Sequence, residues 1–371
     1  MESPFIFNKP LSVTEAIPRN NEVMKITELL TNKKNVLIYE PPKYGKYSLI
    51  QQVINKLKQD KYPFKLCTID LFNIRTEADL LRAIRVSLIN CFASTESEKE
   101  KLEDDLMISY IHEMNEYRDL VLNLSEALAS KFNTNIILYF IEFQEILNFE
   151  NPDKTLKLLE RVWRDHSETT YLITGSHVNA MKQIFEIDRY FYSYIEKINF
   201  QQIPENLFSE YIIKNFLKAG RVVSKEFAAQ IYNFTNGHPY YTQQLAEISF
   251  YKTKGFMTDQ ILHESFEDLL QSHMHEFKEK TSKLSLYQLS LLRAVIDGVT
   301  KFSETQTMEK YHFNSSANIV RLKEAVLKKE ILSYDNEKWN FQDPIYKIWL
   351  EKVFWGSTPG TPGTSTCRSL S

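Results

Sequence analysis

The chain has 371 residues, of which 43% are hydrophobic and 25% are charged, and its formal net charge is −3. This length exceeds what one hydrophobic core usually serves, so the sequence predicts two or three domains of ordinary globular composition. The slightly negative charge provides no overall basic field for nucleic acid, and three scattered cysteines are too few for a disulfide framework. Without a secretion signal or a run of about 18 apolar residues, we expect a cytoplasmic protein that makes no membrane contact.

The first part of the chain alternates short apolar runs with amphipathic stretches. The apolar runs predict strands at residues 35–39, 64–71, 135–143, 169–176 and 195–200. Because apolar runs separated by helices are typical of parallel strands that are covered on both sides, we expect an α/β domain with helices on both faces of a parallel sheet. This domain is predicted to span residues 1–203, with a highly charged helical insertion at 94–118.

The rest of the chain predicts mainly helices. Residues 204–282 are expected to form an α-helical lid domain, which ends in an exposed polar linker at 279–283. Residues 283–355 read as three helices followed by a hairpin around an Asp-Asn turn, which predicts a C-terminal winged helix. The last segment, 356–371, is rich in Gly, Pro, Ser and Thr, and we interpret it as a vector-derived disordered tail.

A phosphate-binding loop is predicted between the first strand and the following helix. Such a P-loop reads Gly-x-x-x-x-Gly-Lys-Ser/Thr, and its backbone N–H groups and lysine hold nucleotide phosphates while the hydroxyl holds magnesium. Gly45 and Lys46 are in place, but Glu40 replaces the first glycine and Tyr47 replaces the hydroxyl residue. The candidate nucleotide-binding residues of this loop are Pro42, Lys43, Tyr44, Gly45, Lys46, Tyr47 and Ser48.

The acidic pair that normally completes a P-loop site should end a later apolar strand. The run at 135–143 is that strand, but Ile141 stands where the magnesium-supporting aspartate is expected. The following acid, Glu142, is the candidate catalytic residue because it could polarise an attacking water; the alternative is an exposed acid at a strand end. Two magnesium contacts are therefore absent, which predicts slow hydrolysis or none.

The motifs together resemble those of the archaeal-type ATPase family, which belongs to the signal-transduction ATPases with numerous domains within the AAA+ group. The resemblance covers residues from about 10 to 355 and is strongest in the later motifs. It is carried by "NVLIYEPPKYGKYSLI", "NIILYFIEFQEI", "TYLITGSHVNAMKQIF", "TNGHPYYTQQLAE" and "NFQDPIYKIWL". The resemblance implies a P-loop ATPase domain, a helical lid and a winged helix.

The resemblance also implies roles for residues outside the loop. Ser176 would occupy the sensor position near the γ-phosphate, Pro239 would lie against the adenine from the lid, and Arg19 would lie near the base. Where the family often has an arginine after the sensor strand, this chain has Tyr194. With Glu40, Tyr47 and Ile141, this makes four departures at separate places, which favours relaxed catalysis.

The predicted winged helix is open to two interpretations. Its third helix carries Arg321, Lys323, Lys328 and Lys329, which could contact DNA phosphates. Acidic residues in the same helix and in the wing offset them. In the family group the module often packs on the ATPase core and moves with nucleotide state, so we favour the regulatory role over DNA binding.

Three functional hypotheses follow. The first is a regulatory switch that binds ATP or ADP, with magnesium weakly held, and signals to a protein partner. The second is a slow ATPase that uses Glu142, and the third is a DNA-binding winged-helix protein with a vestigial nucleotide site.

Overall fold

The computed structural model describes residues 3–7, 15–110 and 113–356. The chain divides into two compact units, the sheet unit (Pro10–Gln201) and the helical unit (Met1–Lys9 with Gln202–Ser371). Except for Gly356, the tail interpreted as vector-derived lies outside the described residues. Within the described part of the chain, no helix has the length and apolar character needed to cross a membrane.

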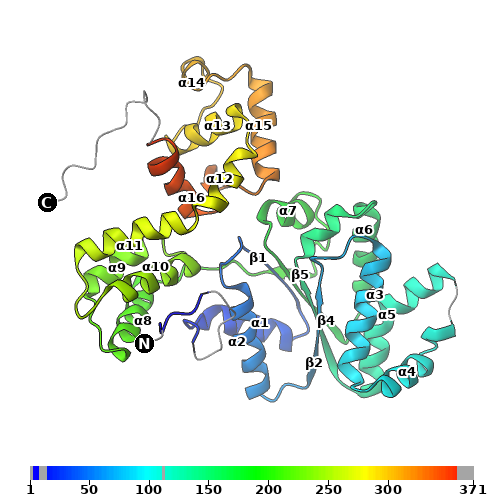
Figure 1. Cartoon of the computed structure of the whole chain (residues 1–371). Helices are drawn as coiled ribbons and strands as arrows, with labels where there is room; N and C mark the ends of the chain where they lie inside the picture. Colours follow the sequence, from blue (N-terminus) through cyan, green and yellow to red (C-terminus); the bar gives the residue numbers. More distant parts are fainter. Residues whose placement is uncertain (1–2, 8–14, 111–112, 357–371) are drawn as a thin grey trace. The chain divides into compact units, whose positions relative to one another are not determined.

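The sheet unit is built on five parallel strands (Figure 1). In chain order they are β1 (Asn35–Tyr39), β2 (Phe64–Asp70), β3 (Asn135–Ile141), β4 (Thr169–Gly175) and β5 (Ile195–Lys197). Their order across the sheet is β2-β3-β4-β1-β5. Each lies in the apolar run that predicted it, and the predicted parallel α/β architecture is confirmed. The carboxyl ends of all five strands consequently meet at one edge of the sheet.

Helices cover both faces of this sheet, so neighbouring strand residues enter different cores. Val36 and Ile38 of β1 pack with the face that α1 (Asn20–Thr31) and α2 (Lys46–Gln59) cover. Leu37 and Tyr39 point to the opposite face. That face packs against α3 (Glu77–Phe92), α5 (Met114–Phe132), α6 (Pro152–Trp163), α7 (Val178–Lys182) and the turns η2 (Phe143–Asn148) and η3 (Gln183–Ile187). Two buried faces explain why the strands read as continuous apolar runs.

The charged insertion is helical, as its sequence predicted. Its main part is α4 (Glu96–Asp105), in which Thr95 and Glu98 form a capping box and Leu102 is the one buried residue. The turn η1 (Ile108–Tyr110) follows, and α5 begins at Met114. One buried leucine anchors this segment, so most of its charge faces solvent.

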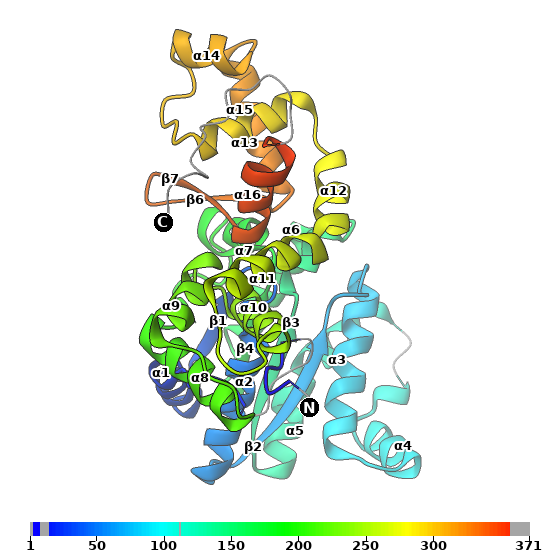
Figure 2. The same cartoon turned by 60° about the vertical axis from the view of Figure 1, so that its left-hand side comes forward.

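The helical unit begins with five helices. They are α8 (Glu205–Lys218), α9 (Lys225–Phe234), α10 (Pro239–Lys252), α11 (Asp259–Ser272) and α12 (Met274–Ser282) (Figure 2). In the segment 279–283, Glu279, Ser282 and Lys283 are exposed as predicted, but the segment is not an open linker, because α12 continues to Ser282 and the side chain of Thr281 is buried. The Thr281 hydroxyl bonds the Phe277 carbonyl and the Tyr346 hydroxyl, which fixes this segment.

The carboxyl-terminal part of the helical unit contains the expected order of three helices and a hairpin. The helices are α13 (Leu286–Ile296), α14 (Thr305–Tyr311) and α15 (Ser316–Lys328). The antiparallel hairpin joins β6 (Leu332–Asp335) to β7 (Lys338–Phe341), and Asn336 and Glu337 in its turn have positive φ. The chain then forms α16 (Pro344–Trp349) and the turn η4 (Leu350–Phe354).

A half-buried carboxylate fixes the entry into β4. Glu126 of α5 accepts backbone N–H bonds from Ser167 at 3.0 Å, Glu168 at 3.1 Å and Thr169 at 2.7 Å. Burial alone raises the pKa of Glu126, but these hydrogen bonds favour the ionised form and hold its pKa below the ordinary value. Three backbone N–H groups thus have the Glu126 carboxylate as their acceptor.

Replacing this charge should weaken the fold in a pH-dependent way. Because the pKa of Glu126 is lowered on folding, its stabilisation is present above the unfolded pKa and is lost as the pH falls through the folded pKa. Since the carboxylate is partly solvent-exposed, we expect Glu126→Gln to lower the free energy of unfolding at pH 7 by only about 1 kcal/mol. Urea denaturation from pH 7 to pH 3 measures this difference, which should shrink towards acid.

The matched control is Asp119→Asn, an exposed acid on the same helix. Its effect should stay near zero throughout. A Glu126→Gln deficit that does not change with pH would show that shape, and not charge, fixes this loop.

Candidate functional site

The loop after β1 has the backbone of an anion site. Gly45 has φ 89° and is the N-cap residue of α2, and Lys43 has φ 65°. Because the left-handed region at Gly45 strains any residue with a Cβ, the glycine is required at this turn. No side chain caps the first turn of α2. The N–H groups at the start of α2 are therefore available to an anion at the carboxyl edge of the sheet.

Lys46 lies at the centre of this loop. Its Nζ donates to the carbonyl oxygens of Glu40 at 2.7 Å and Pro41 at 3.0 Å. Burial lowers the pKa of Lys46 to about 8, and the charges of Glu142 and Glu40 only partly oppose this. The ammonium is thus a partly buried cation whose desolvation the neighbouring acids only partly offset, so a bound anion would stabilise it.

The structure shows how Glu40 is accommodated where a P-loop normally has its first glycine. Its Oε1 accepts the backbone N–H of Phe200 at 3.1 Å, which anchors the side chain to the segment after β5. Burial raises the pKa of Glu40, and the Phe200 bond and the charges of Lys46, Lys197 and Arg19 lower it. The replacement therefore places a partly buried acid beside the loop, and this acid is hydrogen-bonded to the backbone at Phe200.

The predicted catalytic acid and the predicted sensor residue are bonded to each other. Glu142 follows β3 with φ 54°, and its Oε2 accepts from the Ser176 hydroxyl at 2.5 Å and the Ser176 N–H at 3.1 Å. Gln144 Nε2 donates to the same oxygen at 2.6 Å. Gln144 was not predicted from the sequence, and its spacing from Glu142 gave no signal. Three donors therefore share one carboxylate oxygen of Glu142.

The turn that presents Ser176 is closely packed. A Cβ added at Gly175 would lie 2.5 Å from the Met181 side chain and 2.7 Å from Gln144 Oε1. Gly175 pairs with Tyr39 across the β1–β4 ladder, which places the ends of these two strands side by side. The lack of a side chain at Gly175 thus allows Glu142, Ser176 and the P-loop to lie together at the carboxyl edge of the sheet.

The positions that normally serve magnesium are occupied differently. Tyr47 is 45% exposed, and Ile141 lies beside Asp70 in the β2–β3 register. Burial raises the pKa of Tyr139 to about 12, and the charges of Tyr47, Glu142 and Asp70 add to this, so these groups share one neighbourhood. Sequence reasoning missed Tyr139 and Asp70, although the apolar run of β2 visibly ends in an acid.

No group of three or more His, Cys, Asp or Glu side chains that could hold a metal ion occurs among the described residues. The uncapped N–H groups at the start of α2 and the ammonium of Lys46 are donors that suit a chain of phosphates. The two positions that usually support the magnesium ion of a P-loop do not suit it, because they carry the phenol of Tyr47 and the aliphatic side chain of Ile141.

Arg19 and Tyr194 have clear structural partners. Arg19 is buried in the sheet unit, where its guanidinium donates to Gln201 O at 2.6 Å and Glu22 at 3.2 Å. Its contact with a nucleotide base stays a prediction. The Tyr194 hydroxyl donates to Glu160 O at 3.0 Å, so the residue at the lost arginine position fastens to α6.

Other predicted site residues lie outside this cluster. Pro42 and Lys43 are exposed in the loop, and Tyr44 and Ser48 are partly buried. Pro239 is the first residue of α10 in the helical unit, and its contact with adenine stays a prediction.

Two of the lysines considered for DNA contact, Lys323 on α15 and Lys329 directly after it, are engaged in the fold. Lys323 lies 4.4 Å from the ring centre of Phe302 and 5.4 Å from that of Trp339, and desolvation lowers its pKa. Lys329 donates to Lys283 O at 3.1 Å. The prediction that Lys323 reaches a phosphate is therefore not supported, because its ammonium packs on two aromatic rings.

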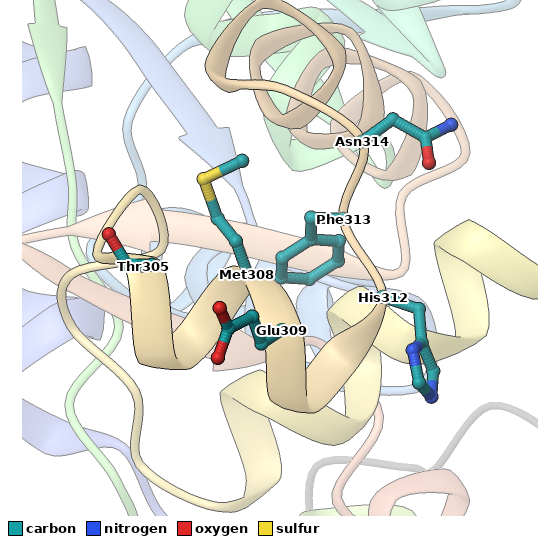
Figure 3. Close-up of a pocket in the computed structure, with 6 residues that line it drawn as sticks. All are labelled: Thr305, Met308, Glu309, His312, Phe313 and Asn314. Atoms are coloured by element: carbon teal, nitrogen blue, oxygen red, sulfur yellow. The ribbon is translucent and has the colours of Figure 1, made fainter.

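A surface hollow of about 500 Å³ lies on α14 and on the connection to α15 (Figure 3). It is lined by Thr305, Met308, Glu309, His312, Phe313 and Asn314. His312 has φ 57° and ends α14. The single acid and the single histidine of this lining give it no concentration of one charge, unlike the P-loop edge.

Comparison with known proteins identifies the fold. No family model matches the sequence, and no curated protein sequence is significantly similar to it. A Walker-type ATPase of Pyrococcus abyssi is similar in structure, with a TM-score of 0.64 and 16% identity over 94% of this chain and 99% of that chain. The ORC1 protein of Aeropyrum pernix, solved in complex with DNA, gives a TM-score of 0.51 and 12% identity over 96% and 99%. The fold is that of a P-loop α/β domain followed by a mainly helical region.

The partly buried charge of Lys46 should lower the free energy of unfolding of the nucleotide-free protein. Because folding lowers the pKa of Lys46 from 10.5 to about 8, the unfolded chain binds more protons between these values, and stability rises with pH across this window. We expect Lys46→Met to raise the free energy of unfolding of the nucleotide-free protein by roughly 1 kcal/mol at pH 7. Denaturation at pH 7 and pH 10 measures the gain, which should shrink at the higher value.

The exposed Lys58 on the same helix provides the control, and Lys58→Met should change stability little at either pH. Loss of stability in Lys46→Met would mean that the two carbonyl contacts outweigh the desolvation of the charge.

Proposed function

We propose that the protein is a nucleotide-binding switch of the AAA+ type, which binds ATP or ADP at the P-loop and hydrolyses ATP slowly or not at all. The observation that supports this most is the position of Lys46. Its ammonium lies at the amino end of α2 and donates to two loop carbonyls, with Glu142 and Ser176 nearby. A triphosphate would supply the negative charge that this arrangement lacks.

The proposal of weak hydrolysis rests on three features of the same edge. Tyr47 supplies a phenol where an aliphatic hydroxyl normally binds magnesium, and Ile141 supplies no oxygen. Glu142 already accepts three hydrogen bonds through one oxygen. The slow-ATPase alternative keeps Glu142 as the base, but it would need these bonds to rearrange when nucleotide binds.

The regulatory interpretation assigns the output to the helical unit. Pro239 would contact the adenine, as the resemblance implies, and a protein partner would recognise the state of the helical unit. The DNA-binding alternative is less well supported, since Lys323 and Lys329 are engaged within the fold. On α15 the exposed Arg321 and Lys328 are accompanied by Glu324 and Val320, which are also exposed.

Nucleotide affinity should depend only weakly on magnesium. Isothermal titration calorimetry with ADP and ATP, in magnesium and in EDTA, measures this. Because the protein lacks the usual magnesium contacts, we expect the Kd to change less than about tenfold, which corresponds to about 1.4 kcal/mol.

Two variants control this titration. Lys46→Met should abolish binding, and Lys58→Met should bind like the parent. A loss of binding in EDTA of a hundredfold or more, roughly 2.7 kcal/mol, would show that protein groups away from Tyr47 and Ile141 hold the magnesium ion. Absence of binding in both buffers would reject the nucleotide proposal itself.

Restoring the two magnesium positions should raise turnover cooperatively. In a four-variant cycle of Tyr47→Thr and Ile141→Asp, the double variant should hydrolyse ATP faster than the product of the single effects predicts. Both side chains would serve one ion, so their contributions couple. The rate of phosphate release under saturating ATP is the measurement.

Strictly multiplicative effects would show that the two positions do not share an ion. If no variant gains activity, adding Tyr194→Arg to the double variant tests whether the missing cation limits the reaction. Continued inactivity of this triple variant while nucleotide still binds would contradict the view that these losses account for weak hydrolysis.

A further inference from the structure

The side chain of Glu40 places a negative charge beside the P-loop, at a position where the loop pattern has no side chain. Its Oε1 accepts the Phe200 N–H at 3.1 Å, and Phe200 lies after β5 in the same sheet unit. The backbone carbonyl of the same glutamate accepts from Lys46 Nζ at 2.7 Å. Glu40 is thus bonded to the P-loop lysine through its backbone and to the segment after β5 through its side chain.

Two of the cations near Glu40 have acids of their own as partners. Burial raises the pKa of Glu40 above its ordinary value, and the Phe200 bond and the charges of the P-loop lysine, Lys197 and Arg19 oppose this. Lys197 Nζ donates to Glu186 Oε1 at 2.7 Å, and Arg19 Nη1 donates to Glu22 Oε1 at 3.2 Å. These two pairs leave the P-loop lysine, which donates to carbonyl oxygens, as the main cation for the carboxylate of Glu40.

The loop therefore carries one more acid than the P-loop pattern provides. The charges of Glu142 and Glu40 both act on Lys46, whereas a glycine in place of the second acid would leave only the first. Lys43 also belongs to the loop, but its side chain is exposed and solvent screens its charge. Because the lysine of a P-loop reaches the β- and γ-phosphates, each phosphate that approaches Lys46 also approaches the acid beside it.

The same edge differs from the usual pattern at the positions that offset the charge of a third phosphate. Tyr47 and Ile141 stand where magnesium is normally supported. Tyr194 stands where the family often has an arginine, and its hydroxyl donates to Glu160 O at 3.0 Å. These three replacements lower the positive charge at the edge and Glu40 adds negative charge, so all four act in the same direction.

We propose that Glu40 is a specificity-determining residue that selects nucleotides by their charge, so that the P-loop binds ADP more tightly than ATP. At an effective dielectric constant of about 20, one unit charge about 10 Å away changes a dissociation constant by roughly tenfold. A triphosphate also balances Lys46, but it brings more negative charge to a loop that already holds two acids. This inference rests on the proposed function, because it concerns the ligand of the same loop.

The test is calorimetry of the full chain with ADP and with ATP, in EDTA at pH 7, on the parent and on Glu40→Gln. The amide keeps an oxygen that can accept the Phe200 N–H but carries no charge. We expect the parent to bind ADP at least about tenfold more tightly than ATP. Glu40→Gln should reduce this ratio at least about fivefold, mainly by tightening ATP, whereas a purely structural role would change both Kd values alike.

The ratio should also depend on pH in the parent. Burial and bound phosphates both favour the protonated form of Glu40, so the ratio of the parent should approach that of Glu40→Gln as the pH falls towards 5. The nucleotides titrate in this range as well, and so do the neighbouring acids Glu142, Glu186 and Glu22. All of these are common to parent and variant, so the comparison of the two at each pH isolates Glu40.

Asp60→Asn is the matched control, because it removes an exposed acid at the other end of α2. The 14 residues of this helix span about 21 Å, which exceeds the Debye length of about 8 Å. Its ratio should equal that of the parent. Glu40→Gly removes both the charge and the Phe200 bond, and a ratio like that of Glu40→Gln assigns the selection to the charge.

The outcomes separate the two proposals. If the parent binds neither nucleotide, the proposed function fails. If the parent binds both equally or prefers ATP, or if Glu40→Gln leaves the ratio unchanged, the selection by Glu40 is overturned and the nucleotide site stands. Should Glu40→Gln fail to fold, Glu40→Gly alone decides: loss of the ADP preference supports the inference, and an unchanged preference overturns it.

Discussion

The parallel arrangement of the five strands is the constraint on which the candidate site depends. Because all strands run in one direction, β1, β3 and β4 deliver their following residues to the same edge, although these residues are far apart in sequence. Lys46 follows β1, Glu142 follows β3 and Ser176 follows β4. The two buried faces keep the strands in this register, because a slip by one residue would turn each apolar side chain towards the wrong core. The chemistry at the edge thus depends on the packing of the whole sheet.

The ammonium of Lys46 in the P-loop carries a charge that its neighbours in the sheet unit only partly offset. Burial lowers the pKa of Lys46 to about 8, and the neighbouring acids Glu40 and Glu142 are both held by bonds to other groups. A fully neutralising partner would make the empty loop more stable but would compete with an anionic ligand. Functional sites commonly keep arrangements that destabilise the ligand-free protein, because the bound ligand supplies the missing interactions. A bound anion would therefore stabilise the charged form of Lys46.

The sequence predicted the strands well because two-sided burial leaves a local signal, namely continuous apolar runs such as that of β3. The Gly-Lys pair of the P-loop pattern also identified Gly45, which adopts the left-handed conformation before α2. The partners of polar side chains had no such signal. The tolerance of Glu40 depends on the Phe200 N–H, 160 residues away, and the packing of Lys323 depends on a ring in the hairpin. The burial of Thr281 within the segment 279–283 had no local signal for the same reason, because it depends on Tyr346.

A switch of the kind proposed here does not need the magnesium contacts that catalysis requires. A ligand shifts a conformational equilibrium only by the difference between its affinities for the two states, so a switch needs binding but no turnover. Rapid hydrolysis would limit the lifetime of the ATP-bound state, whereas a site with Tyr47 and Ile141 would lengthen it. In the helical unit, the buried hydroxyls of Tyr241 and Tyr346 have hydrogen-bond partners, and the partly buried Asp343 accepts three hydrogen bonds. A site of the proposed kind would suit a protein whose output depends on which nucleotide is bound and for how long.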